Sequence, residues 1–113
     1  LPEEDIMYDM VITALTLQSV LEKILLNVVE MTTETICINI EVTWEQHRVK
    51  IMIDVALPKK TLIINHDLRQ HMNFYIQADR LRAHFGQSAD IQSSVASTQI
   101  ITIIDYPLQD VGL

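Results

Sequence analysis

This chain of 113 residues has little glycine, proline, cysteine and basic charge, and each shortage excludes a class of protein. Two glycines and three prolines exclude collagen-like and low-complexity sequences. The single cysteine, Cys37, cannot form an internal disulfide, which favours a reducing compartment. No apolar run approaches the roughly 20 residues of a membrane-spanning helix. The acidic start, Leu1-Pro2-Glu3-Glu4-Asp5, differs from a secretory signal.

Apolar residues, in contrast, are plentiful. Leu, Ile, Val and Phe account for 39 of the 113 residues, which is enough for a compact core. The length fits one domain over residues 1–113 and leaves no room for two. Because the sequence does not begin with methionine, we expect it to be a piece of a longer protein.

The charge is unevenly distributed. Residues 1–57 hold ten acidic and three basic side chains, whereas residues 58–113 hold five of each. A net charge of −7 argues against duplex nucleic acid as a partner, because phosphates require a basic surface. The bases of the second half form either a solvated helix face with a loop, or a docking patch for an acidic protein. They are Lys59, Lys60, Arg69, Arg80 and Arg82.

The clearest pattern is a strict alternation of apolar and polar residues over 36–44 and again over 49–55. Period two predicts two half-buried strands, and the short link 45–47 predicts an antiparallel hairpin. Glu41 and Lys50 are candidates for a cross-strand ion pair on its polar face. Trp44, near the end of the first strand, is interpreted as a core residue or hairpin cover.

Two helices are predicted, over 16–31 and 67–85, with a further short strand over 6–12. The first has apolar residues at steps of three and four, and additional ones that predict cover on more than one side. In the second, Asp67 is the expected N-cap, Tyr75 is expected to reinforce the apolar stripe, and Gly86 is the expected left-handed C-cap. The stripe of the second helix consists of Phe74, Ala78, Leu81 and Phe85.

Two more strands, over 90–94 and 98–106, complete the sequence. Isoleucines in the last one point to both faces, which predicts an interior strand. The predicted fold is an α/β (α+β) two-layer sandwich, with two main helices on a mixed or antiparallel sheet of about four or five strands.

Local motifs give no support for enzyme chemistry. The four histidines (47, 66, 71 and 84) lack the close spacing of a zinc site, and neither glycine lies in a phosphate-binding loop. Cys37 lies within a predicted strand, where an inert buried thiol is the usual finding. We therefore expect no catalytic, cofactor-binding or metal-binding residues in this domain.

Three stretches together resemble the ATP-binding domain of sensor histidine kinases, the GHKL ATPase fold. Residues 21–31 (LEKILLNVVEM) resemble the N-box helix, and 49–58, with Asp54, resemble the strand before the first glycine motif. Residues 83–86, 90–94 and 98–108 resemble the closing helix and final hairpin. The resemblance covers nearly all of the chain, and the order and spacing of the motifs carry it.

The departures from the GHKL pattern fall on its nucleotide-binding residues. Asn27 matches the first N-box asparagine, but Met31 replaces the second, and a thioether is a poor magnesium ligand. Asp54 matches the adenine-binding carboxylate, but Val55-Ala56-Leu57 replaces the glycine turn after it. Gln70–Phe74 fills the place of the second glycine motif, and the twelve residues 55–66 are too few for an ATP lid. Asn27 and Asp54 are then interpreted as structural remnants of a lost nucleotide site.

Degenerate domains of this kind, such as the α/β/loop domains of Rcs-type phosphorelay phosphotransferases, imply a docking role. The expected function is to bind a response regulator near a histidine phosphotransfer domain of the same chain, on the cytoplasmic side of a bacterial inner-membrane protein. No nucleic acid and no direct membrane contact are expected. The open alternatives are a residual ATP-binding domain and a purely structural or dimerising one. The candidate partner-binding residues are Lys59, Lys60, Arg69, His71, Arg80 and Arg82.

Overall fold

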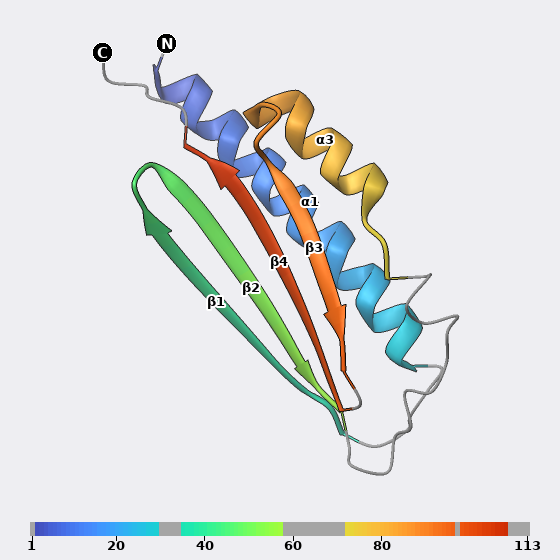
Figure 1. The fold of residues 1–113 in the computed structure, drawn as a ribbon. Helices are drawn as coiled ribbons and strands as arrows, with labels where there is room; N and C mark the ends of the chain where they lie inside the picture. Colours follow the sequence, from blue (N-terminus) through green and yellow to red (C-terminus); the bar gives the residue numbers. More distant parts are fainter. Residues whose placement is uncertain (1, 30–34, 58–71, 97, 109–113) are drawn as a thin grey trace.

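The computed structural model describes residues 2–29, 35–57, 72–96 and 98–108. In this part of the chain, two helices lie on one side of a four-stranded antiparallel sheet (Figure 1). This is the predicted α+β two-layer architecture. The elements, in chain order, are α1 (Pro2–Val29), β1 (Cys37–Glu45), β2 (Arg48–Ala56), α3 (Tyr75–Phe85), β3 (Asp90–Val95) and β4 (Gln99–Pro107).

The strands are ordered β1-β2-β4-β3, and every neighbouring pair is antiparallel. The predicted hairpin of β1 and β2 is confirmed, with Cys37 opposite Ala56 and Glu45 opposite Arg48. Its connection is a two-residue turn, Gln46-His47, which is tighter than the predicted link. The predicted interior position of β4 is also confirmed, because β4 pairs with both β2 and β3.

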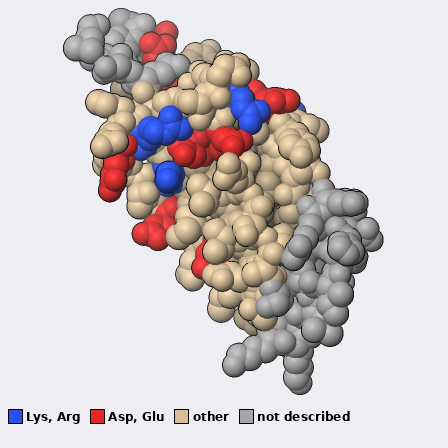
Figure 2. All heavy atoms as spheres, viewed as in Figure 1, with Lys and Arg blue, Asp and Glu red and all other residues tan. Residues whose placement is uncertain are grey.

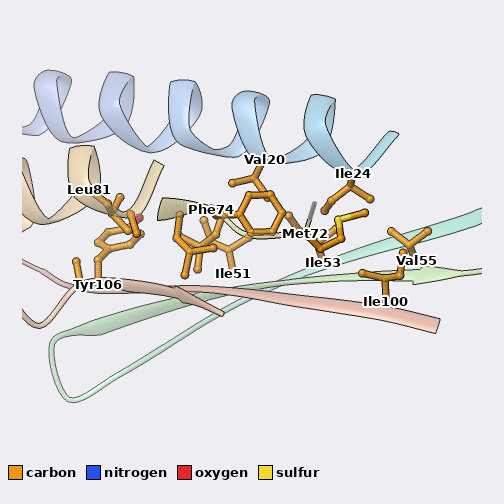
Figure 3. Packing of buried hydrophobic residues seen from close by; sticks show 14 of the residues in the cluster. Val20, Ile24, Ile51, Ile53, Val55, Met72, Phe74, Leu81, Ile100 and Tyr106 are labelled. Atoms are coloured by element: carbon orange, nitrogen blue, oxygen red, sulfur yellow. The ribbon is translucent and has the colours of Figure 1, made fainter. Parts of the chain in front are cut away.

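The core lies between the helices and one face of the sheet. Alternate residues of β2 and β4 are buried, among them Ile53 and Ile100, both fully inaccessible to solvent. Figure 3 shows Val20 of α1 pointing toward the sheet, with Phe74 and Met72 between the two layers. Burying so many branched aliphatic side chains is the main stabilising contribution of the fold.

The predictions for the first 31 residues are partly wrong. A single helix, α1, replaces both the strand predicted over 6–12 and the later helix start at 16. Its buried face repeats every fourth residue, through Thr16, Val20, Ile24 and Val28, as a helix period requires. The N-terminal half has apolar residues on several sides because the rest of the protein covers little of it. Leu26, expected to be covered, is 71% exposed.

Among the described residues, the stretch Glu3–Val28 is long and apolar enough, by length and composition, to cross a membrane. The prediction that no apolar run approaches the length of a membrane-spanning helix is therefore wrong by this criterion, because charged and polar residues are interspersed among the apolar ones. Only 22% of its most apolar window is buried within the protein. A core helix or a signal sequence can pass the same test, so the finding alone does not place α1 in a membrane.

The second predicted helix is shorter than expected. Residues 67–71, with the expected N-cap Asp67, lie outside the described residues. The helix α3 begins at Tyr75, and Phe74, which is not itself helical, occupies the N-cap position. The predicted stripe of 74, 78, 81 and 85 is buried and confirmed. Tyr75 is 74% exposed, so its predicted place in that stripe is wrong. Gly86 ends the helix where predicted, and its N–H donates to the Arg82 carbonyl. Its φ of 106° favours glycine, but its ψ of 171° shows an extended conformation in place of the predicted left-handed C-cap.

Three predictions for β1 are also wrong. Cys37 begins the strand and is exposed, instead of being a buried thiol. Trp44 is 72% exposed and is neither a core residue nor a cover for the hairpin. Glu41 lies opposite Met52, and Lys50 opposite Thr43, so Glu41 and Lys50 are not direct cross-strand partners.

Candidate functional site

An apolar groove runs between the N-terminal half of α1 and strands β1 and β2. Its volume is about 630 Å³. Ile6, Met10 and Leu17 of α1 form one side, and Val42 of β1 lies on the other. Phe85 and Tyr106 also line it. We call this feature the α1–β1 groove.

The groove is open because neither described helix packs on β1. All nine residues of β1 are exposed, although its alternation is as regular as that of β2. The cross-strand register places the apolar residues of β1 opposite the buried residues of β2, on the side of the sheet where the helices lie. Contiguous exposed apolar side chains of this kind mark interaction surfaces. Their exposed fractions are 37% for Ile38, 46% for Ile40, 54% for Val42 and 72% for Trp44.

Two polar pairs fix the α1 side of the groove to the rest of the fold. The Asp9 Oδ1 and His84 Nε2 atoms are 2.6 Å apart, and both side chains are largely buried, at 19% and 27% exposed. The Thr13 hydroxyl donates to the Tyr106 hydroxyl over 3.0 Å. Because these contacts join α1 to α3 and β4, the groove is a preformed feature of the fold.

The aromatic residues beside the groove are packed against one another. The rings of Phe85 and Tyr106 are stacked with centroids 4.3 Å apart, and His84 meets Phe85 edge-on at 4.6 Å. Burial raises the pKa of the Tyr106 phenol above its usual 10.0; the bond from Thr13 opposes this rise, and the nearby charge of Asp9 adds to it. The phenol of Tyr106 therefore lines the groove in its uncharged form at physiological pH.

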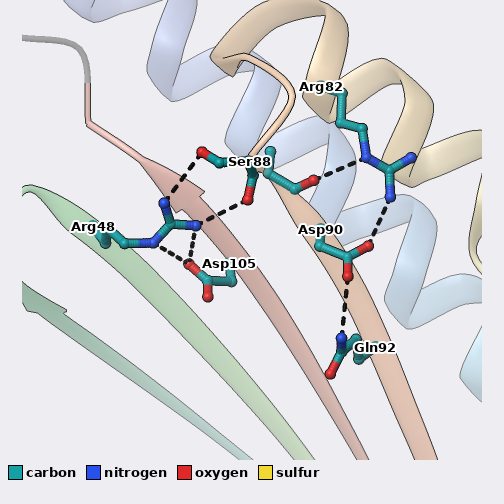
Figure 4. A network of polar contacts seen from close by, with 7 residues as sticks. Arg48, Arg82, Ser88, Asp90, Gln92 and Asp105 are labelled. Carbon is teal, nitrogen blue, oxygen red and sulfur yellow. Dashed lines mark hydrogen bonds and ion pairs between the residues drawn. The ribbon is translucent and has the colours of Figure 1, made fainter.

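The predicted basic docking patch is only partly described. Lys59, Lys60, Arg69 and His71 lie outside the described residues, and Arg80 is exposed on α3. Arg82 contacts the carboxylates of Asp79 at 3.1 Å and Asp90 at 2.8 Å, and its Nε donates to the Ala89 carbonyl. Its charge is therefore used within the fold, joining α3 to β3 (Figure 4).

A second arginine forms a similar network nearby. Nε and Nη2 of Arg48 donate to Asp105 Oδ1 over 3.1 and 2.9 Å, and the Nη atoms donate to the hydroxyl and carbonyl of Ser88 (Figure 4). This arginine connects β2, β4 and the segment before β3. Figure 2 shows the molecule from the same side as Figure 1. Most Lys, Arg, Asp and Glu side chains visible there gather toward one end, and most of the other described surface is uncharged.

The two residues matched to the nucleotide site of GHKL domains do not converge. Asn27 is in the helix layer, and its Nδ2 donates to the Lys23 carbonyl of its own helix. Asp54 is on the opposite face of the sheet, where both its oxygens accept from Gln99 Nε2 at 2.7 and 2.8 Å. No group of three or more His, Cys, Asp or Glu that could hold a metal ion occurs among the described residues. Asn27 and Asp54 each have a local structural partner.

The groove was not predicted from the sequence, which directed attention to the basic residues of the second half. The signal was present in the alternation of β1, but alternation does not reveal whether a helix covers the apolar face. Asp9 and His84, 75 positions apart, offered no local motif. Comparison of the chain with protein-family models, with curated proteins and with solved structures finds no match.

Proposed function

We propose that this domain is a noncatalytic docking module of a phosphorelay protein, and that it binds a response regulator near an adjacent histidine phosphotransfer domain. The α1–β1 groove is the observation that supports docking most directly, because it is apolar, preformed and open to solvent. The separation of Asn27 and Asp54 on opposite sides of the sheet favours docking over a residual ATP site.

The groove fits an amphipathic segment of a partner protein. Its lining is predominantly hydrophobic, so burial of apolar side chains would supply most of the binding free energy. Acidic groups lie close by: Asp9 lines the groove, and Glu3 stands one turn before Ile6 on α1. Basic residues flanking the partner's apolar face would complement the exposed Glu3 carboxylate and speed association, whereas Asp9 is engaged by His84.

A docking role needs no chemistry from this domain. A second, weak contact keeps the regulator at a high effective concentration beside the phosphotransfer histidine, so phosphoryl transfer becomes faster at low regulator concentration. The gain depends on the linker between the two sites and on the affinity of the groove, and it disappears when the groove is blocked.

The test is an NMR titration of the labelled domain with a purified Rcs-type response regulator and, separately, with ATP and Mg²⁺. Shifts with the regulator should cluster at residues lining the groove, and ATP should cause none. Met10→Asp, which places a charge on the α1 side, should weaken regulator binding by at least about tenfold. Leu26→Asp is the matched control, because Leu26 is 71% exposed against 65% for Met10 and does not line the groove.

Three outcomes would overturn the proposal. Regulator binding unaffected by Met10→Asp would exclude the groove, and an absence of regulator binding would exclude the function. Shifts at Asn27 and Asp54 on addition of ATP would show that the domain still binds nucleotide.

A further inference from the structure

We propose that two copies of this domain pair through β1, antiparallel about a two-fold axis at Ile40, and so join their sheets into one of eight strands. This pairing uses the free backbone edge of β1 and does not depend on the identity of the docking partner. The geometry of β1, its sequence and the contrast with the other sheet edge support it.

The edge formed by β1 lacks most of the devices that normally protect an edge strand. It is nine residues long, as long as its neighbour β2, and its register runs without a bulge from Cys37 to Glu45. It contains no proline and no lysine, and no charged side chain points to its helix-side face. Exposed edges are usually short, bulged, or blocked by lysine, proline or inward-pointing charge. A strand of this kind offers its outer N–H and C=O groups to another strand.

The other edge of the sheet shows the contrast. β3 has only six residues, and its helix-side face is covered by α3. The ion pair of Asp90 with Arg82 stands at its start. Of the two edges of the described sheet, β1 is therefore the better suited to pair with a further strand.

The sequence of β1 is complementary to itself in one register. With Ile40 opposite Ile40 of the second copy, Ile38 meets Val42, so the apolar faces coincide. On the other face, Glu41 meets Asn39 and Thr43 meets Cys37. Moving the axis to Glu41 would place two carboxylates directly opposite each other, which is unfavourable. Moving it to residue 42 would bring residue 45, a second glutamate, into the paired segment of each copy and double the negative charge there.

The net charge of −7 opposes pairing of two copies and makes the dimerisation depend on ionic strength. Repulsion between two acidic copies is screened by salt, so the dimer should tighten as ionic strength rises. Docking of a partner with basic flanks should weaken under the same change. Salt dependence therefore separates self-pairing from the docking proposed above.

The first experiment is sedimentation equilibrium of the full chain over roughly 5–500 µM protein at low and high salt. We expect a monomer–dimer equilibrium that shifts toward dimer at high salt. Ile40→Lys sets two ammonium groups opposite each other at the axis and should raise the dissociation constant on the order of a hundredfold. Leu26→Lys is the control for added charge, and circular dichroism verifies that both variants are folded.

The second experiment tests the register. Cys37 is the only cysteine, and it should lie opposite residue 43 of the second copy. The variant Thr43→Cys should therefore allow two symmetric disulfides, each joining Cys37 of one copy to the new thiol of the other. Mild oxidation should then give covalent dimers, whereas Lys50→Cys, on the neighbouring strand β2, should give few. A monomer at every concentration, a dimer unaffected by Ile40→Lys, or equal cross-linking of the two cysteine variants would overturn the proposal.

Discussion

The turn between β1 and β2 has a conformation that its residues disfavour. Gln46 and His47 have φ angles of 52° and 63°, and they are the only described residues other than glycine with positive φ. A two-residue hairpin turn with both φ positive is type I′, for which Asn-Gly is the preferred sequence. A left-handed conformation costs a residue with a side chain roughly 1–2 kcal/mol. The double variant Gln46→Asn/His47→Gly should therefore be more stable than the natural domain.

The size of the gain follows from opposing contributions. Glycine at 47 removes about 1–2 kcal/mol of strain but adds roughly 0.5–1 kcal/mol of unfolded-state entropy. Asparagine at 46 tolerates the left-handed region and recovers about another 0.5 kcal/mol. The free energy of unfolding should thus rise by about 1 kcal/mol, which corresponds to a rise in Tm of about 4 °C for a domain of this size.

Urea and thermal unfolding followed by circular dichroism measure this gain. The matched control is Ala96→Gly in the other hairpin, because Ala96 is exposed and its φ is not positive. That glycine should lower the free energy of unfolding by about 0.5–1 kcal/mol. If both glycine variants changed stability in the same direction, turn strain could not be the cause.

Three further predictions concern the core, β1 and the groove. Leu81→Ala removes a fully buried side chain and should cost about 3 kcal/mol in urea unfolding, whereas Leu26→Ala should change stability by less than about 0.5 kcal/mol. Trp44→Ala should cost less than about 1 kcal/mol, because Trp44 is 72% exposed; a loss as large as that of Leu81→Ala would contradict its described position. The raised pKa of Tyr106 means that the unfolded chain loses its phenolic proton first, so stability should fall as pH rises above about 10. Tyr106→Phe should flatten this alkaline decline, and an unchanged slope would refute the assignment.

The sequence predicted the strands well because their signal is local. The apolar patterns identified the four strands of the described residues to within one or two positions, and the glycine at 86 identified the end of α3. The identical alternation of Ile38-Ile40 and Ile51-Ile53, however, leads to opposite burial. One pair lies in the edge strand and the other in an inner strand, and position in the sheet depends on tertiary packing that no local pattern records.

The start of α1 was mispredicted for a related reason. Residues 6–12 belong to a helix that is only partly covered, so their apolar residues need not keep to one face. The candidate site was less predictable still, because the α1–β1 groove draws Met10, Val42 and Tyr106 from three distant parts of the chain. The basic residues attract notice in a sequence, but Arg82 serves the fold, as its two carboxylate partners show.

The strand order also constrains how the domain folds. β1–β2 and β3–β4 are hairpins that each close over a short loop, whereas the central β2–β4 ladder brings together residues such as Asp54 and Gln99, which are 45 positions apart. Closing the long loop is entropically costly, so the two hairpins should form early and their docking should limit the folding rate. Side chains within the two hairpins and at the β2–β4 seam then govern how fast the chain folds, and contacts that form only after the hairpins dock mainly govern how fast it unfolds.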